Sequence, residues 1–440
     1  MADNLGESIL GGLSKILQTH FSDLESRLEQ LPDVRKRKTY SMSELVFAAI
    51  MLYVLKNGNR HSMNQKRKSR KFRINYKRTF GLRLPHMDTV TAVLEQIHPT
   101  ELENLTIDLV KSLLNRRIFH RHRLLGKYFR IAIDATGYAS FDREPSWSCP
   151  YKTYSNDKKV WMQPILCAKL ILPNGLCIPL LTEWVINKEE YEKQDCELKA
   201  FKRLAEKLKK HFPRLPICIL ADGLYPNGPF FEICKKNHWA FIVVLKDGKL
   251  KAIWEEVALF DKLYAKNQKH TEQILNHNTR KNQSIKWITN LKYQEYPLNW
   301  IGSKEQTHKI EAQKTTLKKQ QKTAFVTNLE IDASNAKQII QTGKLRWKIE
   351  NEGFNEQKNG GYKLEHKMSR TNFNALQNFM HCLQIAHLIN QLLTYTKQFK
   401  AQIQKHFTIK HCWEQINAFL TQGQVNTSTQ QNVQWAVLYP

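Results

Sequence analysis

Three acidic residues in this chain have a type and a position that suit metal chemistry: Asp134, Asp222 and Glu350. Each aspartate directly follows an apolar run typical of a β-strand, and Glu350 stands in the helical-looking stretch 346–350. A carboxylate at the end of a strand projects from the sheet edge into accessible space. Two such strands and one facing helix can therefore bring three carboxylates together. Such a cluster binds divalent metal.

The charge of the chain indicates a polyanionic partner. Its 440 residues hold 68 Lys and Arg against 40 Asp and Glu, a net charge of +28. This excess suits a nucleic-acid backbone, and an anionic membrane surface is the other possible partner. No apolar run has the length of a membrane span, and the N-terminus lacks a signal pattern, so we expect no membrane association. Metal together with a polyanion indicates phosphodiester chemistry on nucleic acid.

The eight cysteines form no CxxC pair and lie mostly in apolar runs. This pattern is typical of reduced, buried thiols in a cytosolic protein. A zinc site built from Cys149, His120 and His122 has no supporting spacing.

The segment Lys66–Arg83 is basic throughout, with nine Lys or Arg among 18 residues and no acid. A solvated charged face would usually mix signs, so we interpret the segment as a surface for the DNA backbone. Phe72, Tyr76 and Phe80 interleave at a spacing of four and are expected to anchor the segment to the core. The residues assigned to DNA binding here are Lys66, Arg67, Lys68, Arg70, Lys71 and Arg73.

The order of the expected elements indicates an α/β fold. Residues 1–125 look helical, with one amphipathic helix at 43–52, and strand-like runs begin at residue 129. Asn174-Gly175 separates two of these runs and predicts a hairpin. The strands are expected at 129–133, 164–172, 176–185, 217–221 and 241–245, with helices at 192–211 and 230–236. This order is that of the ribonuclease-H-like fold, in which the first and fourth strands carry catalytic acids.

A long insertion separates the second aspartate from the glutamate. Glu350 is 350 − 222 = 128 positions beyond Asp222, too far for a bare core of this kind. We expect a basic linker at 314–322, a return strand at 324–328 and a long amphipathic helix at 375–404 that covers the sheet. The predicted division is 1–125 helical DNA-binding domain, 126–249 and 323–395 the two parts of the ribonuclease-H-like mixed sheet with flanking helices, 250–322 a β-rich insertion, and 396–440 a C-terminal helical tail.

Taken together, the chain resembles the DDE transposases of bacterial insertion sequences, whose ribonuclease-H-like core is interrupted by a β-rich insertion. The resemblance spans roughly residues 80–395. Its motifs are Ile131-Ala132-Ile133-Asp134-Ala135-Thr136-Gly137, Leu220-Ala221-Asp222-Gly223-Leu224-Tyr225 and Arg346-Trp347-Lys348-Ile349-Glu350-Asn351.

The resemblance implies a catalytic site of two Mg²⁺ ions, for which Mn²⁺ may substitute, held by Asp134, Asp222 and Glu350. Two ions about 3.5–4 Å apart would activate the attacking oxygen and stabilise the leaving one. Water would nick double-stranded DNA at a transposon end, and the freed 3′-hydroxyl would attack a second phosphodiester, in target DNA or to form a hairpin. It also implies a homodimer that holds two ends together, and a place in the bacterial cytoplasm with the nucleoid.

The resemblance also assigns residues beside the glutamate. Arg346 stands four positions before Glu350, where the family has an Arg that would orient the Glu or contact a phosphate. We expect Trp347 to stack on a base or sugar. The family often has a Tyr three positions before that Arg, where this chain has Gly343. It often has a Lys seven positions after the Glu, where this chain has Gln357 followed by Lys358, and we assign Lys358 to DNA binding.

Several alternatives stay open. Glu352 is a second candidate for the role of Glu350. Asp195 and Glu197 could be outer metal ligands, but acids in the first turn of a helix also suit the helix dipole, and Glu183 is a similar case. At the level of the whole protein, the rivals are a regulatory transposase relic without chemistry and another nuclease built on the same core.

Overall fold

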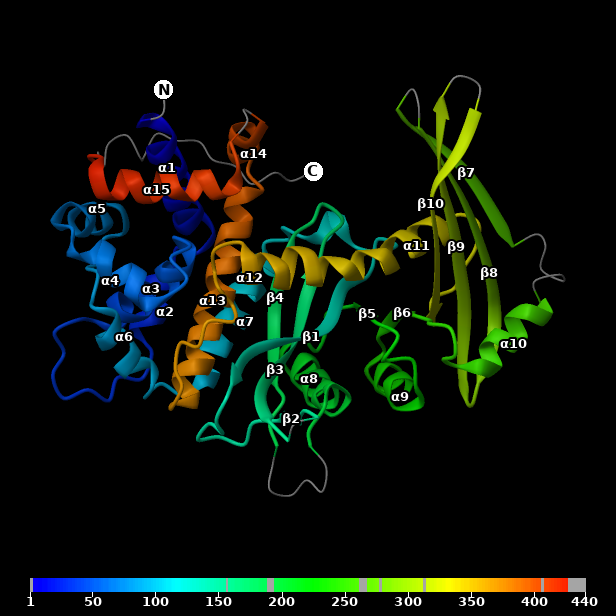
Figure 1. Ribbon diagram of the computed structural model, residues 1–440, viewed down its shortest axis with the longest axis horizontal. Coiled ribbons are helices and arrows are strands. Elements are labelled where there is room, and N and C mark those ends of the chain that lie inside the picture. Colours follow the sequence, from blue (N-terminus) through cyan, green and yellow to red (C-terminus); the bar gives the residue numbers. More distant parts are fainter. Residues whose placement is uncertain are drawn as a thin grey trace.

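The structure is a computed structural model that describes residues 3–155, 157–187, 194–260, 267–276, 279–311, 314–404 and 407–425. Over these ranges a large mixed β-sheet is flanked by helices (Figure 1), which confirms the predicted α/β class.

Helices come first in the chain. They are α1 (Asp3–His20), α2 (Leu24–Glu29), α3 (Met42–Val54), α4 (Arg60–Lys68), α5 (Arg70–Phe80), α6 (Met87–Leu94) and α7 (Pro99–Asn115). The prediction of an amphipathic helix at 43–52 was wrong in one respect, because every residue of α3 is buried. A helix that is apolar all round belongs inside a protein, and α3 packs between its neighbouring helices and the C-terminal part of the chain.

The core of the sheet begins with three antiparallel strands: β1 (Phe129–Phe141), β3 (Lys159–Ile171) and β4 (Cys177–Trp184). The short strand β2 (Tyr151–Thr153) pairs with the first three residues of β3, Lys159 to Trp161. The hairpin predicted at Asn174-Gly175 is confirmed: Leu172 N donates to Leu176 O at 2.9 Å. Gly175 has φ +104, which a residue with a side chain rarely adopts.

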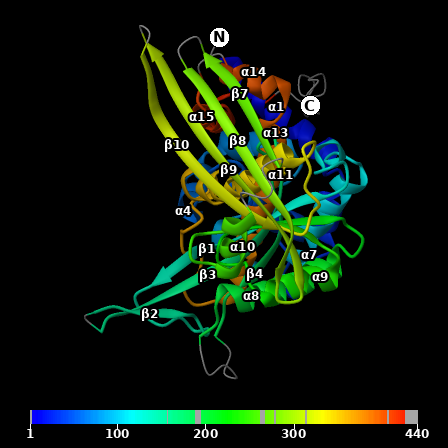
Figure 2. The same cartoon turned by 90° about the vertical axis from the view of Figure 1, so that its right-hand side faces the viewer.

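Two parallel strands complete the core. β5 (Ile217–Ala221) pairs with β1, and β6 (Ala240–Val244) pairs with β5, so the order of strands is β4-β3-β1-β5-β6. The connecting helices are α8 (Glu197–His211) and α9 (Gly228–Asn237), which lie below the strands in Figure 2. The predicted helix 192–211 thus starts at Glu197, while residues 192 and 193 lie outside the described ranges.

The insertion extends the same sheet. After α10 (Lys251–Phe260) come four long antiparallel strands: β7 (Gln268–Asn276), β8 (Thr279–Tyr293), β9 (Tyr296–Glu311) and β10 (Lys314–Thr327). The prediction of a basic linker at 314–322 was wrong, because these residues belong to β10. The end of β10, Phe325–Thr327, pairs with β6 and joins the insertion to the core (Figure 1).

The chain then returns to the core through helical turns. α11 (Ala336–Lys344) is followed by η2 (Leu345–Trp347), by η3 (Ile349–Asn355), which is a π-helical turn, and by α12 (Glu356–Asn359). In Figure 2, α11 lies on the other side of the core strands from α8.

The C-terminal part differs from the single amphipathic helix predicted at 375–404. α13 (Phe373–Thr394) stops at Thr394, and α14 (Lys397–Gln404) and α15 (Ile409–Gln422) follow. α13 is buried nearly all round because it lies between the N-terminal helices and β4. Its polar residues are bonded inside: Asn378 Nδ2, for example, donates to the carbonyl oxygens of Leu94 and Ile97, each at 2.8 Å.

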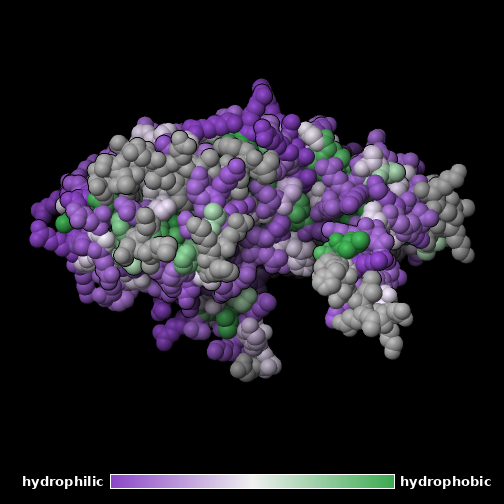
Figure 3. All heavy atoms as spheres, turned by 90° about the horizontal axis from the view of Figure 1, so that it is seen from above, coloured by the Kyte–Doolittle hydropathy of each residue, from purple (hydrophilic) through white to green (hydrophobic). Residues whose placement is uncertain are grey.

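All eight cysteines are free, and seven of them are buried, as predicted, whereas Cys196 is exposed. On the face seen in Figure 3, hydrophilic residues predominate and hydrophobic ones form small scattered groups. No helix in the described ranges is both long enough and apolar enough to cross a membrane.

Candidate functional site: an arginine among carboxylates

Asp134 lies inside β1 rather than at its end, which corrects the expectation drawn from the apolar run. On one side β1 pairs with β3 beyond this point, and Asp134 stands opposite Cys167. On the other side the pairing of β1 with β5 stops at Ala132. The carboxylate of Asp134 therefore lies where the sheet opens between β1 and β5.

Arg346 joins Asp134 to Glu350. Its Nη2 lies 2.9 Å from Glu350 Oε1, and its Nη1 lies 3.5 Å from Asp134 Oδ2. The contact with Glu350 is the one that a spacing of i to i+4 predicts. The Arg346 side chain is only 5% exposed, and its Nε is buried without a hydrogen-bond partner. Trp347 is half exposed, and the Arg346 guanidinium lies 4.3 Å from the centre of its ring.

The π-helical turn η3 changes the register of the chain after Glu350. A π turn closes with one residue more than an α turn, so every later residue is rotated relative to an α-helix. Gln357 consequently points inward: it is fully buried and bonded to Lys169 Nζ at 3.2 Å and to Gln384 Oε1 at 3.0 Å. Lys358, the next residue, is 30% exposed and pairs with Glu365 at 2.7 Å.

Asp222 follows β5 directly, at the turn that leads to α9. Its Oδ1 accepts a hydrogen bond from Leu224 N at 2.8 Å, so it also caps this turn. Its Oδ2 lies 3.2 Å from Lys246 Nζ. Its charge acts on Glu197, the first residue of α8, whose pKa it helps to raise.

Glu197, which the sequence offers as an outer metal ligand beside Asp195, is a fourth carboxylate near these acids. Burial is the largest cause that raises its pKa, which the hydrogen bond from Tyr225 opposes. The Tyr225 hydroxyl donates to Glu197 Oε1 at 2.7 Å. The helix dipole explains an acid in the first turn of a helix equally well, so the sequence alone did not decide between the two roles of Glu197.

The carboxylates influence one another, as the pKa of Asp134 shows. Burial raises it to about 7, against an ordinary value of 3.8; the positive charge of Arg346 opposes this, and the negative charges of Glu350 and Glu197 add to it. Acids that raise one another's pKa favour a bound cation. Carboxylate oxygens are the ligands that Mg²⁺ prefers, so the chemistry of these side chains fits a divalent cation.

The acids are not arranged as a finished metal centre. Within the described ranges, no three His, Cys, Asp or Glu side chains lie close enough together to hold a metal ion. Arg346 stands between Asp134 and Glu350, and Asp222 forms an ion pair with Lys246. The guanidinium provides there the positive charge that keeps two like-charged groups close.

Gly343 shows why this chain has no tyrosine before the arginine. A Cβ atom built at Gly343 would lie 2.7 Å from the ring of Phe325, in the end of β10 that pairs with β6. Any larger residue there would have to displace the Phe325 ring.

The basic segment presents an exposed face on α4 and α5. Lys68, Arg70, Lys71 and Arg73 are exposed, and none of them forms an ion pair with a described residue. Lys66 and Arg67 differ from them, because Lys66 Nζ bonds to Asn417 Oδ1 and Arg67 Nε donates to Leu84 O at 2.9 Å. Burial lowers the pKa of Lys66 to about 8.

The interleaved aromatic residues anchor this segment, as expected. Phe72 and Tyr76 are fully buried, with Phe80 half-buried beside Tyr76. Asn75, also buried, donates to Leu420 O at 3.0 Å, which attaches α5 to α15.

A known protein family matches part of this chain. Residues 192–389 match the model of the transposase DDE domain. The match includes Asp222 and Glu350 and begins after Asp134, and no curated protein matches the chain. The resemblance to the insertion-sequence DDE transposases is thereby confirmed, on residues 192–389.

Proposed function

We propose that this protein is a DNA transposase that binds the ends of a mobile element and cuts and joins DNA at Asp134, Asp222 and Glu350. One observation carries the proposal most directly. Arg346 joins Asp134 on β1 to Glu350, and the chain places these elements together although Arg346 and Asp134 are 212 positions apart. The match to a transposase DDE domain covers the arginine and the glutamate.

The order of the core strands supports a ribonuclease-H-like core. Strands β4, β3 and β1 are antiparallel neighbours, and β5 and β6 continue the sheet in parallel with β1. In such a core the first and fourth strands carry the acids, and here Asp134 lies on β1 while Asp222 follows β5. The division of the chain into a core in two parts, 126–249 and 323–395, around an insertion at 250–322 belongs to the same proposal.

Asp134, Asp222 and Glu350 would hold the two divalent cations, Mg²⁺ or Mn²⁺. When bound, such ions activate the attacking oxygen and stabilise the leaving one. The raised pKa of Asp134 means that a bound cation would displace a proton from this carboxyl near neutral pH. Arg346 would keep its contact with Glu350 and turn its Nε, which has no hydrogen-bond partner, toward a phosphate oxygen.

The reaction consists of two displacements at phosphorus. In the first, a water oxygen bonds to the phosphorus at the element's end, and the bond to the 3′-oxygen breaks, which leaves a 3′-hydroxyl and a 5′-phosphate. In the second, the 3′-hydroxyl oxygen bonds to another phosphorus and displaces a second 3′-oxygen. The role of the protein is to position the reacting groups and to balance their charge, without a covalent protein intermediate.

DNA would lie along two basic regions of the protein. Near the acids, Trp347 is exposed and available for stacking. Lys358 would take the phosphate contact. It is the eighth residue after Glu350, and the extra residue of the π-helical turn places it on the face that the seventh residue would occupy in an α-helix. Away from them, the exposed face of α4 and α5 within the helical region 1–125 would bind the backbone at the element's end. A homodimer would hold two ends together.

The proposal is tested by separating cleavage from binding. Asp222→Ala and Glu350→Ala should each lower Mg²⁺-dependent cleavage of an end fragment by more than about 100-fold, since loss of even an outer partner of a metal ligand typically costs 10–100-fold. Binding of the same fragment should stay equal or become tighter, because a negative charge near the phosphates is lost. Glu352→Ala is the matched control, and its cleavage should stay close to wild type. A binding-only protein, with no cleavage in wild type, would instead be a regulatory relic.

A further inference from the structure

The Glu197 side chain is oriented by a hydrogen bond from Tyr225, whose ring is fixed by its buried packing. Tyr225 is fully buried, and its hydroxyl donates to Glu197 Oε1 at 2.7 Å. The ring packs edge-on against Phe201, with ring centres 5.2 Å apart, and against Phe230 at 5.8 Å. Because Tyr225 follows Asp222 by three residues, one rigid turn presents an acid and also fixes the position of a second one.

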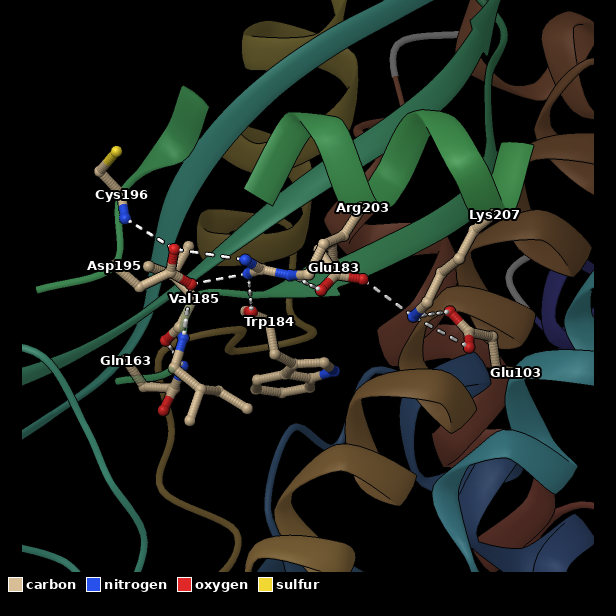
Figure 4. A network of polar contacts seen from close by, with 10 residues as sticks. Glu103, Gln163, Glu183, Trp184, Val185, Asp195, Cys196, Arg203 and Lys207 are labelled. Atoms are coloured by element: carbon tan, nitrogen blue, oxygen red, sulfur yellow. Dashed lines mark hydrogen bonds and ion pairs between the residues drawn. The ribbon is translucent and has the colours of Figure 1, made fainter. Parts of the chain in front are cut away.

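The helix that carries Glu197 is fixed at its start by a network of ion pairs, drawn in Figure 4. Arg203 Nη2 lies 2.6 Å from Asp195 Oδ2, and Arg203 Nε lies 2.7 Å from Glu183 Oε1 at the end of β4. Asp195 also accepts a hydrogen bond from Ile186 N at 3.1 Å. This network accounts for Asp195 and Glu183, which are bonded to Arg203 and are not available as metal ligands.

The same network attaches α8 to the N-terminal helices. Lys207 Nζ, one turn beyond Arg203, lies 2.9 Å from Glu183 Oε2 and 3.4 Å from Glu103 Oε2 on α7 (Figure 4). The first turn of α8 is therefore fixed relative to β4 and to α7, and Glu197 has little room to move away from the other acids.

This leaves Glu197 as the acid at the start of α8 without a charged partner among the described residues. Its carboxylate accepts the hydrogen bond from Tyr225, and Tyr225 N donates to Asp222 O at 3.2 Å, so Glu197 is attached to the turn that carries Asp222. A partly buried acid held among other acids raises the free energy of the folded protein unless a positive charge joins it.

We propose that Glu197 is a fourth carboxylate of the site and contacts the cation held by Asp134, directly or through a bound water, with Tyr225 as its positioning residue. The inference rests on the proposed function. It assigns to Glu197 a role in cation affinity, whereas a purely structural role would give it only a hydrogen bond to Tyr225.

The test measures binding of Mn²⁺ to the full chain by isothermal titration calorimetry, at pH 8 and without DNA. Glu197→Gln keeps a hydrogen-bond acceptor for Tyr225 but loses the charge, and it should raise the Kd by about 10-fold or more, the usual effect of losing a partner around a metal. Tyr225→Phe leaves the carboxylate but frees it, and should raise the Kd by a smaller factor. Glu206→Gln, an exposed acid on the same helix, should leave the Kd unchanged.

Thermal unfolding in EDTA separates the two roles of Glu197. If Glu197 is a cation ligand, Glu197→Gln removes repulsion, and its midpoint without metal should equal or exceed that of wild type. A lower midpoint together with an unchanged Kd would show a structural role and overturn the inference. If Glu197→Gln fails to fold, an unchanged Kd in Tyr225→Phe overturns it instead.

Asp134→Asn distinguishes the failure of this inference from failure of the proposed function. Loss of Mn²⁺ binding in Asp134→Asn, with wild-type binding in Glu197→Gln, would reject only the fourth carboxylate. Wild-type binding in both variants would reject the site itself.

Discussion

Arg346 Nη2 lies 2.9 Å from Glu350 Oε1, one helical turn farther along the chain, and the same guanidinium reaches Asp134 at 3.5 Å. An arginine that is 5% exposed therefore links an acid of the sheet to an acid of the helical segment. Arg346 therefore keeps these two acids close together by its positive charge.

Replacing Arg346 should show that it offsets the repulsion between these acids. In EDTA, Arg346→Met should lower the free energy of unfolding by about 1.5–3 kcal/mol, the usual range for hydrogen bonds to charged groups. Added Mg²⁺ should restore part of this loss, because it supplies a positive charge at the same place. Urea unfolding with and without Mg²⁺ measures both effects.

The control for Arg346→Met is Lys348→Met. Lys348 pairs with Glu352 at 2.6 Å over the same i to i+4 spacing, but at a more exposed position. Its loss should cost only about 0.5 kcal/mol. Equal effects of the two variants would contradict a special role for Arg346.

Asp134 should make stability depend on pH in the opposite sense to an ordinary ion-paired aspartate. Its pKa is raised from 3.8 to about 7 in the folded protein, so the folded state holds a proton that the unfolded state releases. The resulting stabilisation is complete below about pH 4 and is lost as pH rises to about 7. Urea unfolding in EDTA between pH 5 and pH 8 should show a decline in wild type that is weaker in Asp134→Asn. A parallel decline in both proteins would assign the effect to other groups.

The exposed face of α4 and α5 should contribute to DNA affinity through counterion release. Replacing Lys68 and Arg70 together by Ala should reduce the slope of log K against log salt by about 2, since each phosphate contact contributes about 0.9. The measurement is binding of a duplex at several salt concentrations. Lys202 and Lys210, both exposed on α8, provide a control pair of equal charge. If the slope changed only in the control pair, the DNA would bind the surface around α8 and not the exposed face of α4 and α5.

The π-helical turn predicts opposite results for two neighbouring residues. Gln357→Lys would place a second ammonium beside Lys169, which is fully buried and 3.2 Å from Gln357 Oε1, and should cost about 3–5 kcal/mol of stability. Lys358→Gln should change stability by less than about 0.5 kcal/mol but weaken DNA binding. Thermal unfolding and a duplex titration on both variants check this register. A stable, tighter-binding Gln357→Lys would mean that position 357 faces the DNA.

The local parts of the fold could be predicted from the sequence because their causes are local. Asn174-Gly175 gave the hairpin through the positive φ of glycine, and the apolar run before Asp222 gave a short buried strand. Asp134 and Asp222 were chosen because each follows such a run, and Glu350 because it stands in a helical-looking stretch; the structure brings Asp134 and Glu350 to Arg346, and their role in a metal site stays a prediction.

Other parts depend on partners that the sequence does not show. α3 and α13 were taken as amphipathic, but both faces of each are covered, so the polar residues of α13 are bonded inside the protein. Residues 315–322 of β10 are exposed on both faces of the strand and thus show no hydrophobic period. Within the π-helical turn, a Cβ at Gly353 would lie 3.1 Å from Lys169 Nζ and from Cys177 Sγ, so this turn packs closely against residues distant in the sequence. Glu197 was weighed as an outer metal ligand, but the sequence does not show the hydrogen bond from Tyr225 that sets its orientation.

The most direct test incubates the purified protein with Mg²⁺ and labelled DNA that carries the sequences flanking its own gene, beside Asp134→Ala. Under the proposed function, wild type should make nicks at the ends of the element that leave 3′-hydroxyl groups and require the cation, and Asp134→Ala should make none. Equal cleavage by the two proteins, or binding without any cleavage by wild type, would contradict it.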